Sequence, residues 1–555
     1  MRPNVARLSA APYDVVVIGG GIYGLFAAWD ASLRGLSVAL VERGDFGAGT
    51  SFNSLRVIHG GLRYLQHGDL RRMRESIRER TTMMRIAPHL VHPMPFLIPT
   101  YGYGMRGKAA LSLALRMHDI LGFDRNRLDD PQKHLPASWT MSREECLRLF
   151  PEMRAEGLTG AAVFYDCQVQ SSERLIIGLM RSALDAGAEL ANYVEATGFL
   201  IDGQRVAGIT AKDTLSGDEA QIRGRVVINA AGPGLDNVLA LLNDGRPRRK
   251  LALSKAFNVL ISRRLTEKYA FGIQSRRSGR SGGGRGPMFF VTPCHGGSLI
   301  GTEHLPYDGD PDSFEVREEE LSAFLEDVND AYPAAAVSRD EVACTYAGLL
   351  PTTKSGTRHV DLLRHYQIVD HRKREGPEGL ISLVGVKLTE SRLVAQKAVD
   401  LACRQLRKAG PKSATSVTPV HGGHLERFDA FMAREVSKRP HGLAPEDVRH
   451  LIHRYGTAYP EVLEYIDENR ELSSVPPLSS LVRAQVIHSV RREMAQRLGD
   501  VIFRRTALGV FGLPAKPQIE ACASIMADEL RWDDRRKQAE LEALGVASPL
   551  EVRAR

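Results

Sequence analysis

A glycine-rich motif near the start of the chain limits the possible fold more than any other feature. The sequence YDVVVIGGGIYGLFAAWDASLRGLSVALVER has glycines at Gly19, Gly21 and Gly24 in GxGxxG spacing. The first permits a tight turn after a strand, the second lets backbone approach a pyrophosphate, and the third lets the following helix pack on the sheet. Glu42 ends a second apolar run, where an acid accepts hydrogen bonds from ribose hydroxyls. The motif therefore predicts a βαβ unit that binds a dinucleotide.

Length and composition indicate a folded protein with more than one domain. The chain has 555 residues, of which 43% are hydrophobic. This is too long for one hydrophobic core, so we expect two or three domains. No uncharged apolar run reaches about 18 residues and no signal-peptide core is present, so we expect a cytoplasmic protein. The six cysteines are scattered, without CxxC pairs or histidines at zinc spacing. We expect reduced thiols and no metal site.

The formal net charge of +8 favours an anionic partner, such as nucleic acid, anionic lipid or a phosphorylated substrate. Nucleic acid ranks last, because the basic residues are dispersed and no zinc-finger or RNP pattern is present. Arginines are concentrated at 70–85. This stretch predicts a helix with a solvated basic face, balanced in part by Glu75 and Glu79.

The remaining segments suggest how the chain is organised. RVVINAAGPGLD at 225–236 is typical of a chain that returns to a nucleotide-binding sheet after a long excursion, as in FAD proteins. The strand-rich segment 255–366 predicts an antiparallel sheet. GLISLVGVKLTESRLVAQKAVDLA at 379–402 predicts a strand, a turn and a helix capped by Thr389. From 419 onward the pattern is helical, and RAQVIHSVRREMAQRLGDVIFRRTALG predicts one amphipathic helix.

These patterns predict an α/β fold of three units. The first is a Rossmann-like FAD-binding domain, and the second is a substrate or cap domain built on the antiparallel sheet. The third is a C-terminal helical domain. We expect the FAD-binding domain at 13–95, 165–245 and 345–405, the substrate domain at 96–164 and 246–344, and the helical domain at 406–545.

Several motifs occur together in an order that resembles one family. They are IHGGLRYL, FYDCQVQSSERL, VINAAGPG, GTEHLPYDGDP, YAGLLP, RHYQIVDH, GVKLTESR and REMAQRLGDVIFRRTALG. With the glycine motif, they resemble the FAD-dependent glycerol-3-phosphate dehydrogenases over nearly the whole chain. The resemblance implies a flavoprotein of the D-amino-acid-oxidase type that contains FAD. It also implies hydride transfer from substrate C2 to flavin N5, with electrons passing to a membrane quinone or, in the oxidase branch, to oxygen.

The resemblance also implies roles for individual residues. His59 would lie close to the flavin, and Gly60 and Gly61 would lie against its ring system. The residues with an implied catalytic role are His59, Arg63, Arg364 and Lys387. Those implied to bind substrate are Arg63, Tyr64, Asn258, Arg364 and Thr389. Those implied to bind the cofactor are Gly19, Gly21, Gly24, Glu42, Arg43, Thr50, Ser51, Arg56, His59, Gly60, Gly61, Val194, Ala230, Gly232, Gly385, Lys387, Leu388 and Thr389.

Simpler interpretations exist for three of these residues. His59 alone also has a less favoured interpretation as a histidine that bonds to backbone at the start of a helix. Lys387 and Arg364 alone would be read as members of surface ion pairs. The chemistry nevertheless fits their types, because a phosphate ester needs fixed cations and an alcohol needs a base as its hydride leaves.

The sequence departs from the family pattern at several positions. Leu350 replaces an arginine that helps to hold the substrate phosphate, and Asn258 replaces a histidine that approaches the substrate. Leu55 and Arg56 stand where a serine and a lysine are usual, and Val386 stands where the turn usually has a second glycine. The loss of one charged hydrogen bond weakens binding by about 1.5 to 3 kcal/mol.

Three hypotheses about function follow. The first keeps glycerol 3-phosphate as substrate, with Lys354, Arg358 or Arg56 supplying the missing charge. The second is a divergent oxidoreductase that acts on another anionic alcohol or amine, and the third is a flavoprotein without catalytic activity. The sequence favours the first slightly and leaves open whether the protein forms a homodimer. Basic and apolar residues around Met105–Leu121 predict peripheral contact with the inner face of the cytoplasmic membrane.

Overall fold

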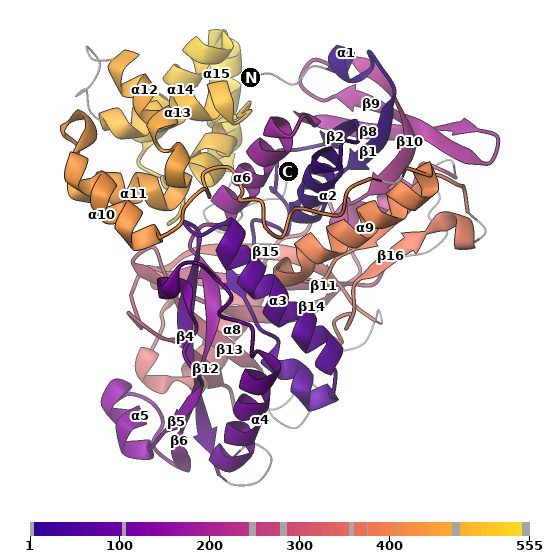
Figure 1. Cartoon of the computed structure of the whole chain (residues 1–555). Coiled ribbons are helices and arrows are strands. Elements are labelled where there is room, and N and C mark those ends of the chain that lie inside the picture. The colour runs from indigo at the N-terminus through magenta and orange to yellow at the C-terminus, as the bar shows by residue number, and fades with distance from the viewer. Residues whose placement is uncertain are drawn as a thin grey trace.

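The computed structural model describes residues 5–102, 107–243, 251–277, 286–353, 360–374, 376–408, 410–468 and 478–546. Figure 1 shows two sheets that meet near the middle of the molecule and a group of helices to one side. This is the α/β architecture with a C-terminal helical domain that the sequence predicts. All six cysteines are free thiols, and five of them are buried.

The first sheet carries the glycine motif at the carboxyl end of its central strand. In spatial order its main strands are β16 (Gln367–Asp370), β17 (Leu380–Val384), β10 (Glu219–Asn229), β1 (Tyr13–Ile18), β2 (Val38–Glu42) and β7 (Glu189–Asn192). All neighbouring pairs from β17 to β7 are parallel, and only β16 runs antiparallel. Every residue of β1 is buried, as expected for a central parallel strand covered on both faces. The carboxyl ends of these parallel strands therefore meet at one edge.

Different elements cover the two faces of this sheet. The helices α2 (Ile22–Leu33), α6 (Ser172–Asp185) and α9 (Ser391–Leu406) pack on one face. On the other face, β9 (Arg205–Asp213) pairs antiparallel with the first half of β10, and β8 (Val194–Asp202) pairs antiparallel with β9. The short helices α1 (Val5–Leu8) and α7 (Leu235–Ala240) lie near β10. The first sheet is thus a layer between helices and a three-stranded antiparallel extension.

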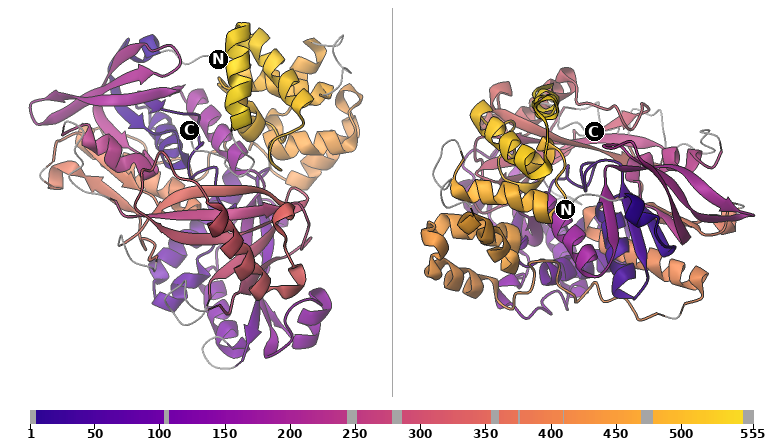
Figure 2. Two further views of the ribbon diagram at one scale, coloured as in Figure 1. Left: turned by 180° about the vertical axis from the view of Figure 1, so that it is seen from behind. Right: turned by 90° about the horizontal axis from the view of Figure 1, so that it is seen from above.

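The second sheet is almost wholly antiparallel. Its order is β15 (Val342–Pro351), β11 (Leu253–Ile261), β14 (Gly297–Tyr307), β13 (Met288–Cys294), β12 (Ala270–Gln274), β4 (Val91–Tyr101), β6 (Leu158–Val169) and β3 (Val57–Ile58), with β5 (Trp139–Met141) beside β6. Only β12 and β4 pair in parallel. Helix α8 (Glu318–Ala331) lies across one face, and its Phe324 packs against Phe257 and Phe289 (Figure 2, left). Strands β4, β6 and β15 each cross one of the expected domain boundaries.

Three further helices surround the second sheet. They are α3 (Leu70–Ile86), α4 (Lys108–Leu121) and α5 (Arg143–Leu149). The predicted solvated face of α3 is confirmed for Arg71 and Arg78, which are exposed, and Arg71 pairs with Glu75. It is wrong for Arg72 and Arg80, which are 4% and 0% exposed. Arg72 pairs with Glu390 and Arg80 pairs with Asp166, and these carboxylates come from distant parts of the chain.

The C-terminal unit is helical. It consists of α10 (Phe428–Lys438), α11 (Pro445–Tyr455), α12 (Pro460–Glu468), α13 (Ser480–Arg492), α14 (Lys516–Leu530) and α15 (Asp534–Val546), with a short π-helix over Asp500–Arg505. Seen from above, this unit lies beside the first sheet (Figure 2, right).

Two expected helix features are wrong. The single amphipathic helix expected over 483–509 is broken, because α13 ends at Arg492 and Met494 has a left-handed backbone with φ of 57°. At that break the Glu493 carboxylate turns inward to pair with Arg174. Thr389 does not cap α9, since its hydroxyl oxygen instead accepts a hydrogen bond from the backbone N–H of His59 at 3.2 Å.

Candidate active site

A cavity of about 850 Å³ lies at the carboxyl edge of the first sheet and extends to the second sheet. It is lined by residues from the ends of β1, β2, β10 and β17 and by residues of β11, β14 and β15. Of the residues singled out by the sequence, it brings together Gly19, Gly21, Glu42, Arg43, Thr50, Ser51, Arg56, His59, Val194, Ala230, Gly232, Asn258, Gly385, Lys387, Leu388 and Thr389. Gly24, Gly60, Gly61 and Tyr64 lie outside this lining.

The glycine turn has the geometry that its spacing predicts. Gly19 has a φ of 107°, which favours glycine, and a Cβ on Gly24 would lie 1.9 Å from the carbonyl oxygen of Gly19. Close packing of α2 on β1 therefore requires the third glycine. Gly21 differs, since a Cβ there would meet only the Ser51 hydroxyl oxygen, at 3.1 Å. Its open side and the N-terminus of α2 leave room for an anionic group.

Glu42 joins the glycine turn to the start of the loop that follows β2. Its carboxylate accepts hydrogen bonds from the backbone N–H of Gly20 at 2.6 Å and of Gly44 at 2.8 Å. Burial raises its pKa above the ordinary value. The carboxylate also lines the cavity, so contact with a ribose hydroxyl stays a prediction.

His59 lies directly after β3 and also lines the cavity. Its ring lies edge-on to the ring of Tyr64, with centroids 6.0 Å apart. Burial and the positive charges of Lys387, Arg72 and Arg80 hold its pKa well below 6.5. The imidazole is therefore neutral near pH 7 and can accept a proton.

A buried charge cluster lies behind His59. The Lys387 ammonium donates to the Tyr64 hydroxyl at 2.5 Å and lies 4.4 Å from the centre of that ring. The Tyr64 hydroxyl donates to the Glu390 carboxylate at 3.3 Å, and the Arg72 guanidinium donates to the same carboxylate at 2.9 Å. Tyr23 fixes the backbone of Lys387 by donating to its carbonyl at 2.7 Å. These contacts place one ammonium group near the histidine at the cavity wall.

Known proteins match this chain along its length. Residues 14–396 match the family described as FAD dependent oxidoreductase, and residues 413–537 match the C-terminal domain of alpha-glycerophosphate oxidase. A glycerol-3-phosphate dehydrogenase from Synechocystis is 33% identical over 524 residues, which are 91% of each chain. The aerobic glycerol-3-phosphate dehydrogenase of Staphylococcus aureus is 30% identical over 550 residues, which are 96% of this chain and 94% of the relative. The chain belongs to the FAD-dependent glycerol-3-phosphate dehydrogenase family.

A solved structure agrees with this assignment. The X-ray structure of the glycerol-3-phosphate dehydrogenase from Bacillus halodurans, complexed with FAD, superposes with a TM-score of 0.79 at 26% identity. The match covers 99% of this chain and 97% of that chain. The cofactor of this family member is accordingly FAD, and the cavity suits it, since it joins the open side of Gly21 to His59 and Lys387 without a break in its lining.

Arg56 has other partners than a substrate phosphate. It is 1% exposed, and its guanidinium donates to the carbonyl of Gln170 at 3.0 Å and to the Tyr346 hydroxyl at 3.3 Å. The carboxylate of Glu173, also buried, lies 3.4 Å from the same guanidinium. This pairing neutralises Arg56, which weakens the expectation that it replaces the missing family arginine.

Leu350 and Asn258, the two departures from the family pattern that concern the substrate, both face the cavity. Leu350, near the end of β15, adds an apolar side chain to the lining. The Asn258 side-chain oxygen accepts from the Thr302 hydroxyl at 2.7 Å, and its amide donates to the carbonyl of Tyr346 at 3.5 Å. The pocket therefore has a neutral amide and an aliphatic group at the two positions where the resemblance leads us to expect a histidine and an arginine.

The structure describes the side chain of only one of the two arginines expected to face the substrate. Arg364 is exposed and lies outside the cavity lining, although the nearby Leu362 is part of it. The role in catalysis and substrate binding that the resemblance implies for Arg364 therefore stays a prediction. Arg63 lies in a 3₁₀ turn over Leu62–His67, and its side chain falls outside the described residues, as do Lys354 and Arg358.

Sequence reasoning missed three carboxylates that organise the site. The Asp166 carboxylate accepts from the backbone N–H of Gly60 at 2.6 Å and pairs with Arg80, which fixes the segment after His59. Glu390 orders Tyr64 and Arg72, and Asp312 lines the cavity and pairs with Arg43. All three lie within or next to motifs that carry the family resemblance, so the motifs were the available signal.

Proposed function

We propose that this protein oxidises sn-glycerol 3-phosphate to dihydroxyacetone phosphate and passes the electrons to a quinone. The observation that carries the proposal is the position of a neutral His59, with Lys387 beside it, in the cavity that also contains the dinucleotide turn. The choice of substrate is based on the relatives named glycerol-3-phosphate dehydrogenase, which align over more than nine-tenths of the chain.

The residues can handle the proton of this reaction. Oxidation of the C2 alcohol removes one proton from the hydroxyl and one hydride from the carbon. When bound, FAD supplies the acceptor of that hydride at N5. His59 accepts the hydroxyl proton, and the Lys387 ammonium stabilises the negative charge that develops on the oxygen. Thr389 fixes the backbone of His59, and Tyr64 fixes the ammonium group of Lys387.

A second candidate is a divergent enzyme of the same fold that oxidises another anionic alcohol or amine. Leu350 and Asn258 favour it, because they remove cationic character from the cavity wall. In the first candidate, phosphate binding falls to cations such as Arg63, whose charge would be paired with the phosphate. In the second, the native substrate would lack the phosphate or carry it elsewhere.

A turnover assay separates the two candidates. The purified FAD-loaded protein is mixed with glycerol 3-phosphate and a water-soluble quinone, and the product is identified. We expect one dihydroxyacetone phosphate for each quinone reduced. Turnover of a different anionic alcohol or amine, with none of glycerol 3-phosphate, would support the divergent enzyme. No turnover with any candidate would support the flavoprotein without catalytic activity.

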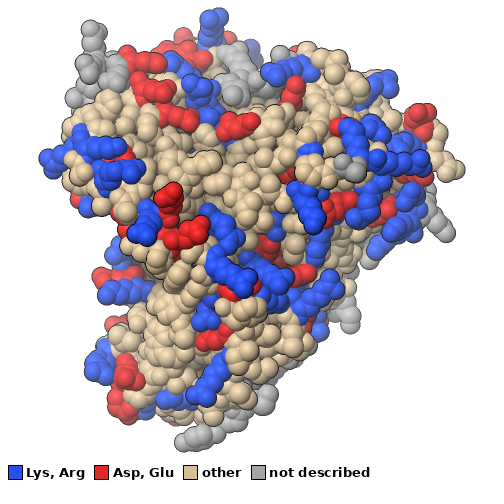
Figure 3. Space-filling model, in the orientation of Figure 1, with Lys and Arg blue, Asp and Glu red and all other residues tan. Residues whose placement is uncertain are grey.

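The quinone acceptor requires the protein to reach a membrane. Among the described residues, no helix is both long and apolar enough to cross a bilayer. Helix α4 instead presents Leu113, Met117 and Ile120 on one face, with 62%, 42% and 71% of each residue exposed. Phe123 follows the helix and is 73% exposed, with Arg74 stacked on its ring. Figure 3 shows largely uncharged surface toward this end of the molecule, with both basic and acidic groups scattered over it. We propose that α4 docks on an anionic membrane surface.

A further inference from the structure

The loop after β2 forms a large part of the cavity wall near the glycine turn. Arg43, Gly44 and residues 47–51 of this loop line the cavity. The loop contacts the glycine turn twice, because the backbone N–H of Gly47 donates to the carbonyl of Gly20 at 3.0 Å and Ser51 accepts from the N–H of Ile22 at 3.0 Å. The position of this loop therefore sets the shape of the dinucleotide cradle.

Asp45 anchors this loop from its far side. Its side chain is fully buried and does not line the cavity. One carboxylate oxygen accepts from the Arg505 guanidinium at 2.7 Å and from the Asn192 amide at 3.2 Å. The other accepts from Arg504 at 2.5 Å and also pairs with Arg505. Burial acts to raise the pKa of Asp45, but Arg505 and Arg504 outweigh it and hold the pKa below its usual value.

Both arginines belong to the C-terminal unit. They end the π-helix over Asp500–Arg505, about 460 residues away from Asp45 along the chain. Arg505 is also fully buried, and it donates to the backbone carbonyl of Glu493 at 2.9 Å. Two contacts thus fix its guanidinium between the helical unit and the cofactor loop.

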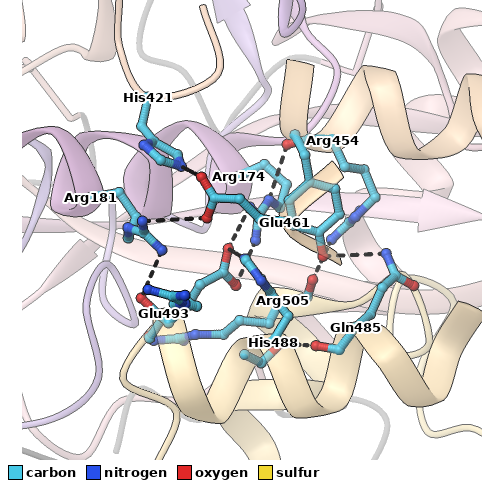
Figure 4. A network of polar contacts seen from close by, with 12 residues as sticks. Arg174, Arg181, His421, Arg454, Glu461, Gln485, His488, Glu493 and Arg505 are labelled. Atoms are coloured by element: carbon cyan, nitrogen blue, oxygen red, sulfur yellow. Dashed lines mark hydrogen bonds and ion pairs between the residues drawn. The ribbon is translucent and has the colours of Figure 1, made fainter. Parts of the chain in front are cut away.

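The same arginine belongs to a wider buried network. Figure 4 shows Arg505 and Arg174 converging on Glu493 between α6 and the C-terminal helices. The Glu493 carboxylate accepts two hydrogen bonds from Arg174, at 2.9 Å and 2.7 Å, and the Arg454 guanidinium donates to the carbonyl of Arg505 at 3.0 Å. Because Glu493 stands where α13 breaks, this break serves to orient the network.

We propose that Asp45 and Arg505 are positioning residues for the cofactor, so that retention of FAD by the first unit depends on the C-terminal helical unit. The pair fixes the loop whose residues 47–51 complete the cradle. It does so from outside the cavity, without contact with the substrate region. The inference goes beyond the proposed function, because it holds whichever alcohol or amine is oxidised.

An alternative role for these residues is to join the units without affecting the cofactor. The Glu461 carboxylate offers a matched control, because it pairs with Arg181 on α6 at 3.4 Å and with His421 at 3.2 Å. This ion pair links the same units and touches no residue of the cofactor loop. A general effect of unit docking would appear in variants of either pair, whereas a positioning effect would appear only in variants of Asp45 or Arg505.

The first test measures FAD affinity. Apo protein is prepared for wild type, Asp45→Asn, Arg505→Lys and Glu461→Gln, and FAD is titrated back with flavin fluorescence as the readout. We expect Kd to rise about tenfold or more in the first two variants, since a charged hydrogen bond is lost or distorted, and to change less than twofold in Glu461→Gln. Thermal unfolding of each apo protein shows whether the variants fold. Equal Kd values in Asp45→Asn, Arg505→Lys and wild type would overturn the proposal.

The second test uses the unaltered protein, so that folding of a variant cannot obscure it. Coupling between two sites is reciprocal, so FAD must stabilise the contacts that help to hold it. We expect FAD binding to slow amide hydrogen exchange at 493–506 by severalfold, while exchange in α14 and α15 stays unchanged. Unchanged exchange at 493–506 would contradict the proposal, as would uniform slowing across the whole helical unit.

Discussion

At the scale of single residues, the site depends on a neutral base held beside a fixed cation. The pKa of His59 is lowered by burial and by Lys387, Arg72 and Arg80. The folded protein therefore disfavours the imidazolium that the unfolded chain would form below about pH 6.5. Stability contributed by the neutral ring is lost as pH falls below that value, and activity that needs the neutral ring persists to a lower pH.

This arrangement predicts a specific change in the pH profile. In Lys387→Met the positive charge near His59 is lost, so the pKa of His59 rises and the acid limb of kcat/KM moves to higher pH. Activity also falls, because the developing charge on oxygen loses its stabilisation. The readout is the pH dependence of flavin reduction in stopped flow. A profile that drops in height without moving would show that Lys387 does not act on His59.

His59→Ala is the matching test of the base itself. We expect flavin reduction to slow by about 10²- to 10⁴-fold, the usual contribution of general-base catalysis, with a smaller change in KM. Thr389→Ser, which keeps the hydroxyl that accepts from the His59 N–H, serves as the control and is expected to retain activity. Near wild-type reduction in His59→Ala would remove it from the reaction.

Leu350 tests the substrate. If glycerol 3-phosphate is bound by other cations, Leu350→Arg should leave kcat/KM unchanged or lower it, because a second charge would crowd the cavity. If the pocket has diverged, Leu350→Arg with Asn258→His should raise kcat/KM for glycerol 3-phosphate by about 10-fold or more, the value of a new charged hydrogen bond. Steady-state kinetics of wild type and the variants with glycerol 3-phosphate decides between these two hypotheses.

At the scale of elements, short-range motifs were predictable and long-range partners were not. The spacing of Gly19, Gly21 and Gly24 is enough to predict β1, the turn and α2, since Gly19 and Gly24 meet local steric needs and Gly21 leaves room for the cofactor. The basic face of α3 misled the sequence analysis, because its partners Asp166 and Glu390 lie 86 and 318 residues away. The break at Glu493 was hidden for the same reason, as it depends on Arg174.

Helix α4 carries the prediction that belongs to this scale. Leu113→Ser with Ile120→Ser should weaken binding to vesicles of anionic lipid by about 30-fold, since burial of each exposed aliphatic side chain contributes on the order of 1 kcal/mol. Ile201→Ser is the control, because Ile201 is 54% exposed on β8, away from α4. Vesicle co-sedimentation at low and high salt is the readout. Equal weakening in all variants, or no binding by wild type, would contradict docking through α4.

At the scale of the whole molecule, all three units contribute to the cavity or to the loop that lines it. The first sheet supplies the dinucleotide turn, the second sheet supplies Asn258 and Leu350, and the helical unit reaches the cofactor loop through Arg505. The sequence resemblance predicted the three kinds of unit, and most of the cofactor residues that it implied do line the cavity. It could not show that Arg56 is neutralised by Glu173 or that Arg364 is exposed, because both depend on how distant segments pack.

Anaerobic reduction of the bound flavin tests the central claim most directly. FAD-loaded wild-type protein is mixed with glycerol 3-phosphate in the absence of oxygen and quinone, and the absorbance of the oxidised flavin is followed. We predict rapid and complete bleaching, with one dihydroxyacetone phosphate formed for each flavin reduced. A flavin that stays oxidised with excess glycerol 3-phosphate, yet is reduced at once by a chemical reductant, would contradict the claim that this cavity oxidises glycerol 3-phosphate.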